Sequence, residues 1–142
     1  MIKIILDTNF LLIPAQFNVD IFSEIRRIAE DRYRLFIVDK TLDELDNIIA
    51  LQKGKHKSAA MLAKSIAAKL IKSGELNIIK TGKTERLLNV DDLILKMANS
   101  CDYAVATQDV ALKRKLRQNN VALIVLRQKK YLEMQKCFTK QN

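Results

Sequence analysis

The 142-residue chain contains only three glycines, one proline and no tryptophan. So few glycines exclude a phosphate-binding P-loop and a dinucleotide-binding glycine turn, because each motif needs several glycines within a short segment. The single histidine, His56, removes the usual parts of a zinc site and of a histidine-activated nucleophile. No stretch rich in proline or glycine indicates a linker between domains.

Cysteines and long apolar runs are scarce as well. Cys101 and Cys137 lack metal-ligand spacing and are too few for a disulfide framework, so we expect both thiols to be reduced in an intracellular compartment. The apolar residues 2–6 are stopped by Asp7, and no run approaches the roughly 18 apolar residues of a membrane span. We therefore expect a cytoplasmic protein with no membrane partner.

The length and composition fit one domain. With 49% hydrophobic residues, a chain of this length buries roughly two thirds of its unfolded surface, which is enough for a core without stabilising metal. We expect a single domain over residues 1–142, with a core that ends at about residue 126 and a C-terminal extension over 127–142.

The net charge of +9 is distributed unevenly along the chain. Residues 1–51 contain 6 Lys+Arg and 9 Asp+Glu, a balance of −3, whereas residues 52–142 contain 19 and 7, a balance of +12. A polyanionic partner such as RNA explains an acidic cluster in a basic protein, because Lys and Arg bind phosphates while carboxylates bind metal. A solvated, lysine-rich surface is the alternative.

Apolar runs alternate with segments of helical periodicity. Helices are expected from Asn18 to Arg32, from Thr41 through Ile49, over 56–72, after Asn89 and over 109–116, and Tyr131 and Met134 lie at the spacing of a final helix. The expected strands are 3–6, 34–38, 76–79, 103–106 and 121–126. Strands separated by helices imply right-handed crossovers, so the fold class is an α/β/α sandwich around a mainly parallel five-stranded sheet.

Four carboxylates follow predicted strands or begin the next helix: Asp7, Glu44, Asp91 and Asp109. The carboxyl ends of parallel strands meet at the edge of the sheet where open α/β folds bind ligands. Carboxylates gathered there repel one another unless a hard divalent cation neutralises them. The pattern therefore predicts a Mg²⁺ or Mn²⁺ site.

Each acid also has a purely structural interpretation. Thr41 followed by Glu44 has the spacing of a capping box, in which the glutamate bonds to the backbone at the start of a helix. Asp91 and Asp92 fall in the first turn of the helix capped by Asn89, where negative charge favours the helix dipole. Asp7 is different, because it leaves a charge between two apolar runs, and such a charge is costly unless it is paired.

Two basic segments are candidate RNA contacts. The first is the charged loop with Lys53, Lys55 and Lys57, and the second is the helix after Asp109 with Lys113, Arg114, Lys115 and Arg117. The second segment directly follows Asp109, and this position beside the predicted acids favours phosphate contact. A solvated surface is the alternative for both segments.

Four ordered motifs together resemble the PIN-domain ribonucleases. They are residues 7–12 (DTNFLL), 42–45 (LDEL), 90–94 (VDDLI) and 104–109 (AVATQD), the last followed by 112–114 (LKR), and the similarity spans about residues 1–126. The resemblance implies a Rossmann-like sheet of order 3-2-1-4-5 and one or two Mg²⁺ or Mn²⁺ ions. It maps the catalytic and metal-binding acids of the family onto Asp7, Glu44, Asp91 and Asp109, with Thr8, Asn9, Asp92 and Thr107 in support.

Within this family, the first and last motifs are more similar to the branch that cleaves precursor ribosomal RNA in the small-subunit processome than to the VapC toxins. The implied activity is a metal-dependent endoribonuclease that acts on single-stranded RNA and leaves a 5′-phosphate and a 3′-hydroxyl. A toxin ribonuclease paired with an antitoxin and a catalytically silent RNA-binding scaffold stay open as alternatives. A ribosomal particle and a second copy of the chain are further possible partners.

Two other folds place an aspartate after the first strand. A phosphatase of the haloacid-dehalogenase type needs a second acid two residues later, where this chain has Asn9. A receiver domain needs adjacent acids at the strand end, which Asp7 and Thr8 do not provide. Both are excluded.

Overall fold

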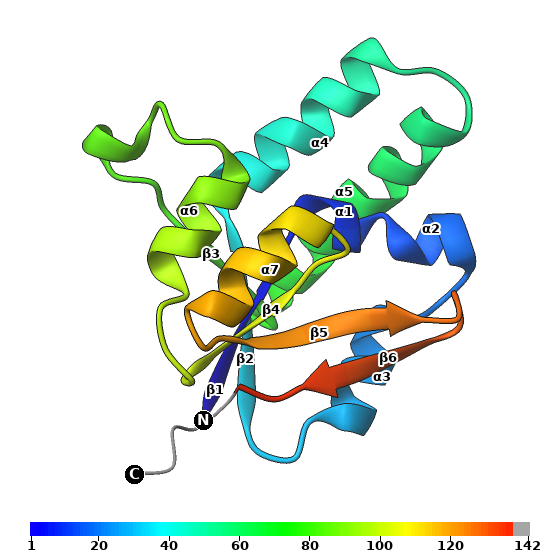
Figure 1. The fold of residues 1–142 in the computed structure, drawn as a ribbon. Helices are drawn as coiled ribbons and strands as arrows, with labels where there is room; N and C mark the ends of the chain where they lie inside the picture. The colour runs from blue at the N-terminus through cyan, green and yellow to red at the C-terminus, as the bar shows by residue number, and fades with distance from the viewer. Residues whose placement is uncertain (138–142) are drawn as a thin grey trace, which may run out of the picture.

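A six-stranded β-sheet runs through the middle of the computed structural model, which describes residues 1–137 (Figure 1). The strands are β1 (Ile2–Leu6), β2 (Tyr33–Val38), β3 (Leu76–Ile79), β4 (Tyr103–Ala106), β5 (Ala122–Arg127) and β6 (Tyr131–Gln135). Their order is β3-β2-β1-β4-β5-β6; the first five are parallel, and β6 pairs antiparallel with β5. The expected five strands, their order and their parallel arrangement are therefore confirmed.

Helices cover both faces of the sheet. They are α1 (Thr8–Leu11), α2 (Ile13–Phe17), α3 (Ile21–Ile28), α4 (Asp39–Leu51), α5 (Lys55–Ser73), α6 (Val90–Met97) and α7 (Val110–Gln118), with a 3₁₀ turn η1 (Lys83–Glu85). Ile4 and Leu6 of β1 pack with the α1–α5 side, while Ile5 between them packs with α6 and α7. A strand buried on both faces reads as a continuous apolar run, which explains residues 4–6. No helix within residues 1–137 has the length and apolar character to cross a membrane.

The expected final helix is wrong, because the segment forms strand β6. Leu132 is 1% exposed while Tyr131 is exposed, which is the two-residue alternation of a strand. Gln128 and Lys129 both have positive φ, 52° and 55°, in the turn that reverses the chain from β5. Turns of this handedness match the twist of a hairpin, so they direct the chain back along β5.

The start of α3 also differs from the expectation. Asp20, not Asn18, caps this helix, and its carboxylate accepts hydrogen bonds from the backbone N–H groups of Phe22 and Ser23. Asn18 instead ends α2 in the left-handed conformation, with φ 55°. Asparagine is suited to both positions, so its presence alone does not distinguish the start of one helix from the end of another.

The first turn of α4 fixes the loop that leads to α6. The Asp39 carboxylate accepts a hydrogen bond from the Thr81 backbone N–H at 2.8 Å and a second from its hydroxyl. Lys40 donates to the backbone carbonyls of Arg86 and Leu88 at the other end of the loop. These contacts hold both ends of the 81–89 loop against one helix.

Side chains of α3 cover part of the outer edge of β6. Glu24 accepts a hydrogen bond from the Leu132 backbone N–H at 2.9 Å, and Arg27 donates to the Leu132 carbonyl at 3.0 Å. Glu24 and Arg27 also form an ion pair at 2.9 Å. The backbone of the last strand is thus bonded on both sides at this point.

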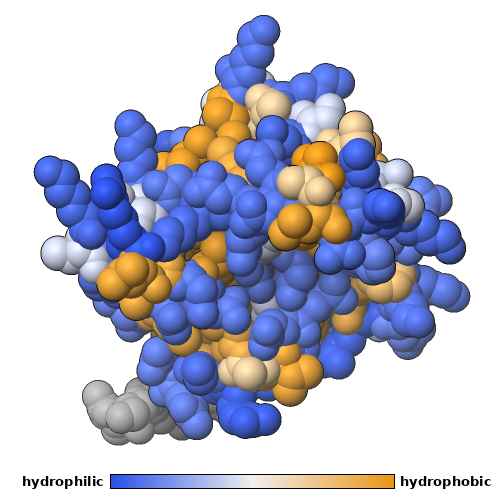
Figure 2. Space-filling model, turned by 90° about the horizontal axis from the view of Figure 1, so that it is seen from above, coloured by the Kyte–Doolittle hydropathy of each residue, from blue (hydrophilic) through white to orange (hydrophobic). Residues whose placement is uncertain are grey.

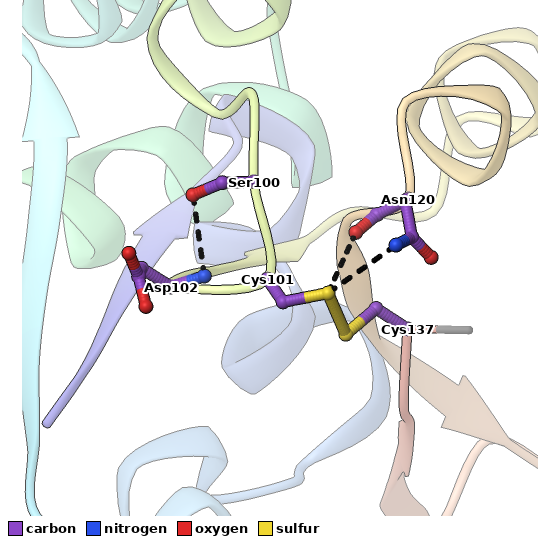
Figure 3. The surroundings of a disulfide bond; sticks show 5 residues. All are labelled: Ser100, Cys101, Asp102, Asn120 and Cys137. Atoms are coloured by element: carbon purple, nitrogen blue, oxygen red, sulfur yellow. Dashed lines mark hydrogen bonds between the residues drawn. A yellow bond between two sulfur atoms is a disulfide. The ribbon is translucent and has the colours of Figure 1, made fainter. Parts of the chain in front are cut away.

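The two cysteines form a disulfide, contrary to the expectation of reduced thiols (Figure 3). Cys137, just after β6, joins Cys101 in the loop before β4, with their Cα atoms 6.0 Å apart. Asn120 donates a side-chain hydrogen bond to the Cys101 sulfur at 3.4 Å. The pairing was not visible in the sequence, because it depends on β6 returning along β5 and bringing the end of the chain back to this loop.

Candidate active site

The four predicted acids line one cleft of about 380 Å³ at the carboxyl edge of the sheet. Asp7 follows β1, Glu44 lies on α4, Asp91 is in the first turn of α6, and Asp109 precedes α7. Parallel pairing of β1 with β4 brings Leu6 opposite Ala106, and this register places the segments after the two strands side by side. Four segments that are distant in sequence therefore contribute to a single cleft.

Asp7 is the buried member of this group, with 4% of its surface exposed. Its carboxylate accepts hydrogen bonds from the Thr107 hydroxyl at 2.7 Å and from the Thr8 backbone N–H at 2.8 Å. Burial raises the pKa of Asp7 from 3.8 to about 6; the Thr107 bond opposes this, and the negative charges of Asp91 and Glu44 add to it. The Asp7 carboxylate is therefore held in place in a setting that disfavours its charge.

Glu44 does not form the capping box. The helix starts earlier, at Asp39, so Thr41 lies inside α4, buried, rather than at its N-cap. Glu44 instead accepts a hydrogen bond from the Thr8 hydroxyl, 36 positions away in sequence. The carboxylate of Glu44 is thereby held beside Asp7, and the capping interpretation is wrong.

Asp91 and Asp109 complete the acidic lining. Partial burial raises the pKa of Asp91, and the charges of Asp109 and Glu44 raise it further. Asp109 also caps α7, since its carboxylate accepts a bond from the Leu112 backbone N–H at 2.9 Å. A capping role and a place in the cleft are thus compatible, because the helix begins at this edge of the sheet.

The supporting polar residues lie in the same region, with one exception. Asn9 lines the cleft, and its side-chain oxygen is 3.4 Å from the Gln108 backbone nitrogen that donates to it. The Thr107 hydroxyl both donates to Asp7 and accepts from the Asp109 backbone N–H at 3.1 Å, so it links two of the acids. Asp92 is exposed and does not line the cleft.

The donor set of the cleft suits a hard divalent cation, because carboxylate oxygens are the preferred ligands of Mg²⁺ and Mn²⁺. Within residues 1–137, no three His, Cys, Asp or Glu side chains are close enough to hold an ion as they stand. Binding an ion would therefore draw the carboxylates closer together. Burial raises the pKa values of Asp7 and Asp91, the charges of neighbouring acids raise both further, and a bound cation would offset both effects.

The wall of the cleft includes three residues that sequence reasoning missed: Leu12, Asn47 and Ile48. Asn47 and Ile48 follow Glu44 by three and four positions, so they lie on the same face of α4 as that acid. This spacing was the available signal.

The predicted basic residues are spread over different surfaces. Lys115 is near enough to Asp91 for its positive charge to offset part of the rise in the pKa of that acid. Arg117, at the other end of α7, donates to the Gln135 side chain at 2.8 Å and faces β6. The segment with Lys53, Lys55 and Lys57 joins α4 to α5 at the end of the helix pair away from the sheet (Figure 1). Figure 2 shows the molecule from above, the side of α4, where hydrophobic patches lie between hydrophilic side chains.

A family model described as a PIN-like domain matches residues 4–129. The chain belongs to the PIN-like domain family. It is 33% identical over 138 residues to Ribonuclease VapC4 of Methanocaldococcus jannaschii, a similarity that covers 94% of this chain and 97% of that protein. Among solved structures, it is similar to the PIN domain endonuclease Utp24, with a TM-score of 0.70 and 19% identity over 99% of this chain and 96% of the other. At that identity, the likeness to Utp24 shows a shared fold.

Proposed function

We propose that this protein is a metal-dependent endoribonuclease. The observation that supports this best is the cleft lined by four carboxylates from four separate segments. Membership of the PIN-like family and the similarity to a VapC ribonuclease agree with it. The alternative, in which all four acids only cap helices, does not account for Glu44, because its carboxylate accepts a hydrogen bond from the Thr8 hydroxyl and not from a helix end.

Each residue of the cleft has a defined part in this proposal. Asp7, Asp91 and Asp109 hold one or two Mg²⁺ or Mn²⁺ ions, and Glu44 helps to hold or orient them. Such ions lower the pKa of water and stabilise the leaving oxygen of a phosphodiester. The hydroxyl groups of Thr107 and Thr8 fix the Asp7 and Glu44 carboxylates before substrate binds.

The substrate of this proposal is single-stranded RNA. A flexible strand can enter an open acidic cleft whose surroundings are basic, whereas a duplex presents its phosphates on a rigid surface. Lys115 on α7 lies near Asp91, and we expect Lys113, Arg114 and Lys115 of this helix to contact phosphates. The products are a 5′-phosphate and a 3′-hydroxyl.

The test is cleavage of end-labelled single-stranded RNA by the purified protein with Mn²⁺, with Mg²⁺ and with EDTA. We expect cleavage only with metal. Asp7→Asn and Asp91→Asn should abolish cleavage and retain RNA binding, since the phosphate contacts lie elsewhere. Asp102→Asn is the matched control, because this exposed acid precedes β4 at the opposite edge of the sheet. Cleavage by Asp7→Asn at the wild-type rate would show that the site is wrongly assigned.

Two biological roles are candidates for this ribonuclease. The motif pattern favours an enzyme that processes precursor ribosomal RNA. The similarity to VapC4, which covers nearly the full length of both chains, favours a toxin ribonuclease with an antitoxin as partner. The toxin role has the stronger support, because the likeness to Utp24 at 19% identity shows only the fold. Growth arrest on expression, relieved by the product of a small neighbouring gene, would identify the toxin type; altered ends of small-subunit rRNA on depletion would identify the processing type.

A further inference from the structure

One wall of the cleft contains no carboxylate. Leu12, which follows α1, and Ile48 of α4 are half-buried and give this wall an apolar surface. Asn47 lies beside Ile48 and is exposed, so its amide is accessible from the solvent. The cleft therefore has an acidic part and a second part that is apolar with one amide.

The second part continues outward from the acids along α4. Leu51 follows Ile48 by three positions on the same helix face and is 79% exposed. A phosphate held beside Glu44 by a divalent cation would therefore have the Asn47 and Ile48 side chains within reach of its next chemical group. For an RNA strand, the group next to each phosphodiester is a ribose with its base.

We propose that Leu12, Asn47 and Ile48 form a subsite for the nucleobase next to the cleaved phosphate. This inference rests on the proposed ribonuclease function and adds a specificity-determining wall to it. The cleft volume of about 380 Å³ is near the lower limit of small-molecule sites, roughly 300–1,000 Å³, which suits one nucleotide rather than a duplex.

The chemistry of the wall fits a base in two ways. Aliphatic side chains pack against the flat faces of any base, so Leu12 and Ile48 contribute affinity without discrimination. The Asn47 amide offers a donor and an acceptor side by side, which can pair with the edge of a base and discriminate between bases. The amide is also the reason to prefer a base over an apolar side chain of a protein partner, which would use only Leu12 and Ile48.

The experiment uses single-stranded RNA with randomised positions, cleaved by the full-length protein with Mn²⁺ and sequenced at the new ends. For wild type we expect one base to be enriched at one position beside the cut. Asn47→Ala should reduce this enrichment about fivefold or more, the lower limit for a bidentate contact to a base edge. Ile48→Ala should raise KM about fivefold or more with little change in kcat, because it removes packing against the base.

Matched controls separate this role from a loss of folding. Ile49→Ala removes the same side chain from the neighbouring position; both isoleucines pack against the core, but only Ile48 also lines the cleft. Gln52→Ala removes an exposed amide just after α4. Asn47 is exposed, so its substitution leaves the fold intact and remains informative even if Ile48→Ala unfolds.

The outcomes are distinct for the two proposals. Cleavage by wild type with no base preference, or a preference that Asn47→Ala retains, would overturn the base subsite and leave the ribonuclease function standing. Equal KM values for Ile48→Ala and Ile49→Ala would also overturn it and would favour a protein partner on this wall. No metal-dependent cleavage by wild type would overturn the proposed function and, with it, the subsite.

Discussion

Asp7→Asn tests whether burial, together with the charges of Asp91 and Glu44, disfavours the ionised Asp7 carboxylate, and it needs no RNA. In the unfolded chain the carboxyl loses its proton near pH 3.8, whereas in the folded protein the pKa of Asp7 is about 6. Between these values the folded protein binds more protons than the unfolded chain, so wild-type stability falls as the pH rises. At 1.36 kcal/mol per pKa unit, the loss above pH 6 is about 3 kcal/mol.

The variant should not show this loss, because asparagine does not ionise. It weakens the hydrogen bonds from Thr107 and Thr8, at a cost of about 1 kcal/mol at every pH. We therefore expect Asp7→Asn to be less stable than wild type by about 1 kcal/mol near pH 4 and more stable by about 2 kcal/mol near pH 7.5.

Urea unfolding followed by circular dichroism, in EDTA across this pH range, measures the difference. Asp102→Asn is the control, because Asp102 is exposed and precedes β4 at the opposite edge of the sheet from the cleft. Mn²⁺ at a hundredfold over its dissociation constant should then stabilise wild type by about 2.7 kcal/mol and the Asp7 variant much less. A stability difference that is constant with pH would refute the raised pKa of Asp7, and the lack of a Mn²⁺ effect on wild type would refute the metal site.

Three further predictions address other parts of the molecule. Alanine at Lys113, Arg114 and Lys115 should lower the slope of log K against log salt for RNA binding by about 2, at roughly 0.7 per lost contact; an unchanged slope would place RNA elsewhere. Cys101→Ser should lower the unfolding free energy by about 2–4 kcal/mol in oxidising buffer, because the disulfide closes a 36-residue loop, and should change nothing once reductant is present. Gln128→Val should cost about 1–2 kcal/mol, since this position has φ 52°, whereas Gln128→Asn should be tolerated; equal melting temperatures would contradict the turn.

The parallel sheet could be predicted because each of its five strands is a short apolar run between helical segments. Asp7 and Asp91 could be predicted for the same reason: their positions after a strand and at a helix start are local features of the chain. The contact between Thr8 and Glu44 could not be predicted, since it joins residues 36 positions apart. The capping-box pattern at Thr41 favoured a local partner for Glu44, and tertiary contact overrode it.

The errors near the C-terminus share one physical cause. Tyr131 and Met134 fit a helical spacing, but a strand beside β5 buries Leu132 better. Five residues are too few for periodicity to distinguish the two structures. The disulfide between Cys101 and Cys137 depends on that strand, so the wrong helix also concealed the pairing.

The Glu24–Arg27 pair on α3 has a consequence for self-association. An edge strand with unbonded N–H and carbonyl groups is a template on which a second copy of the same strand can add. At Leu132 both groups already have partners on α3, so two β6 strands could join edge to edge only after those bonds and the ion pair were displaced. The bonds at Leu132 thus hinder the addition of a second copy to β6 at this point of the strand.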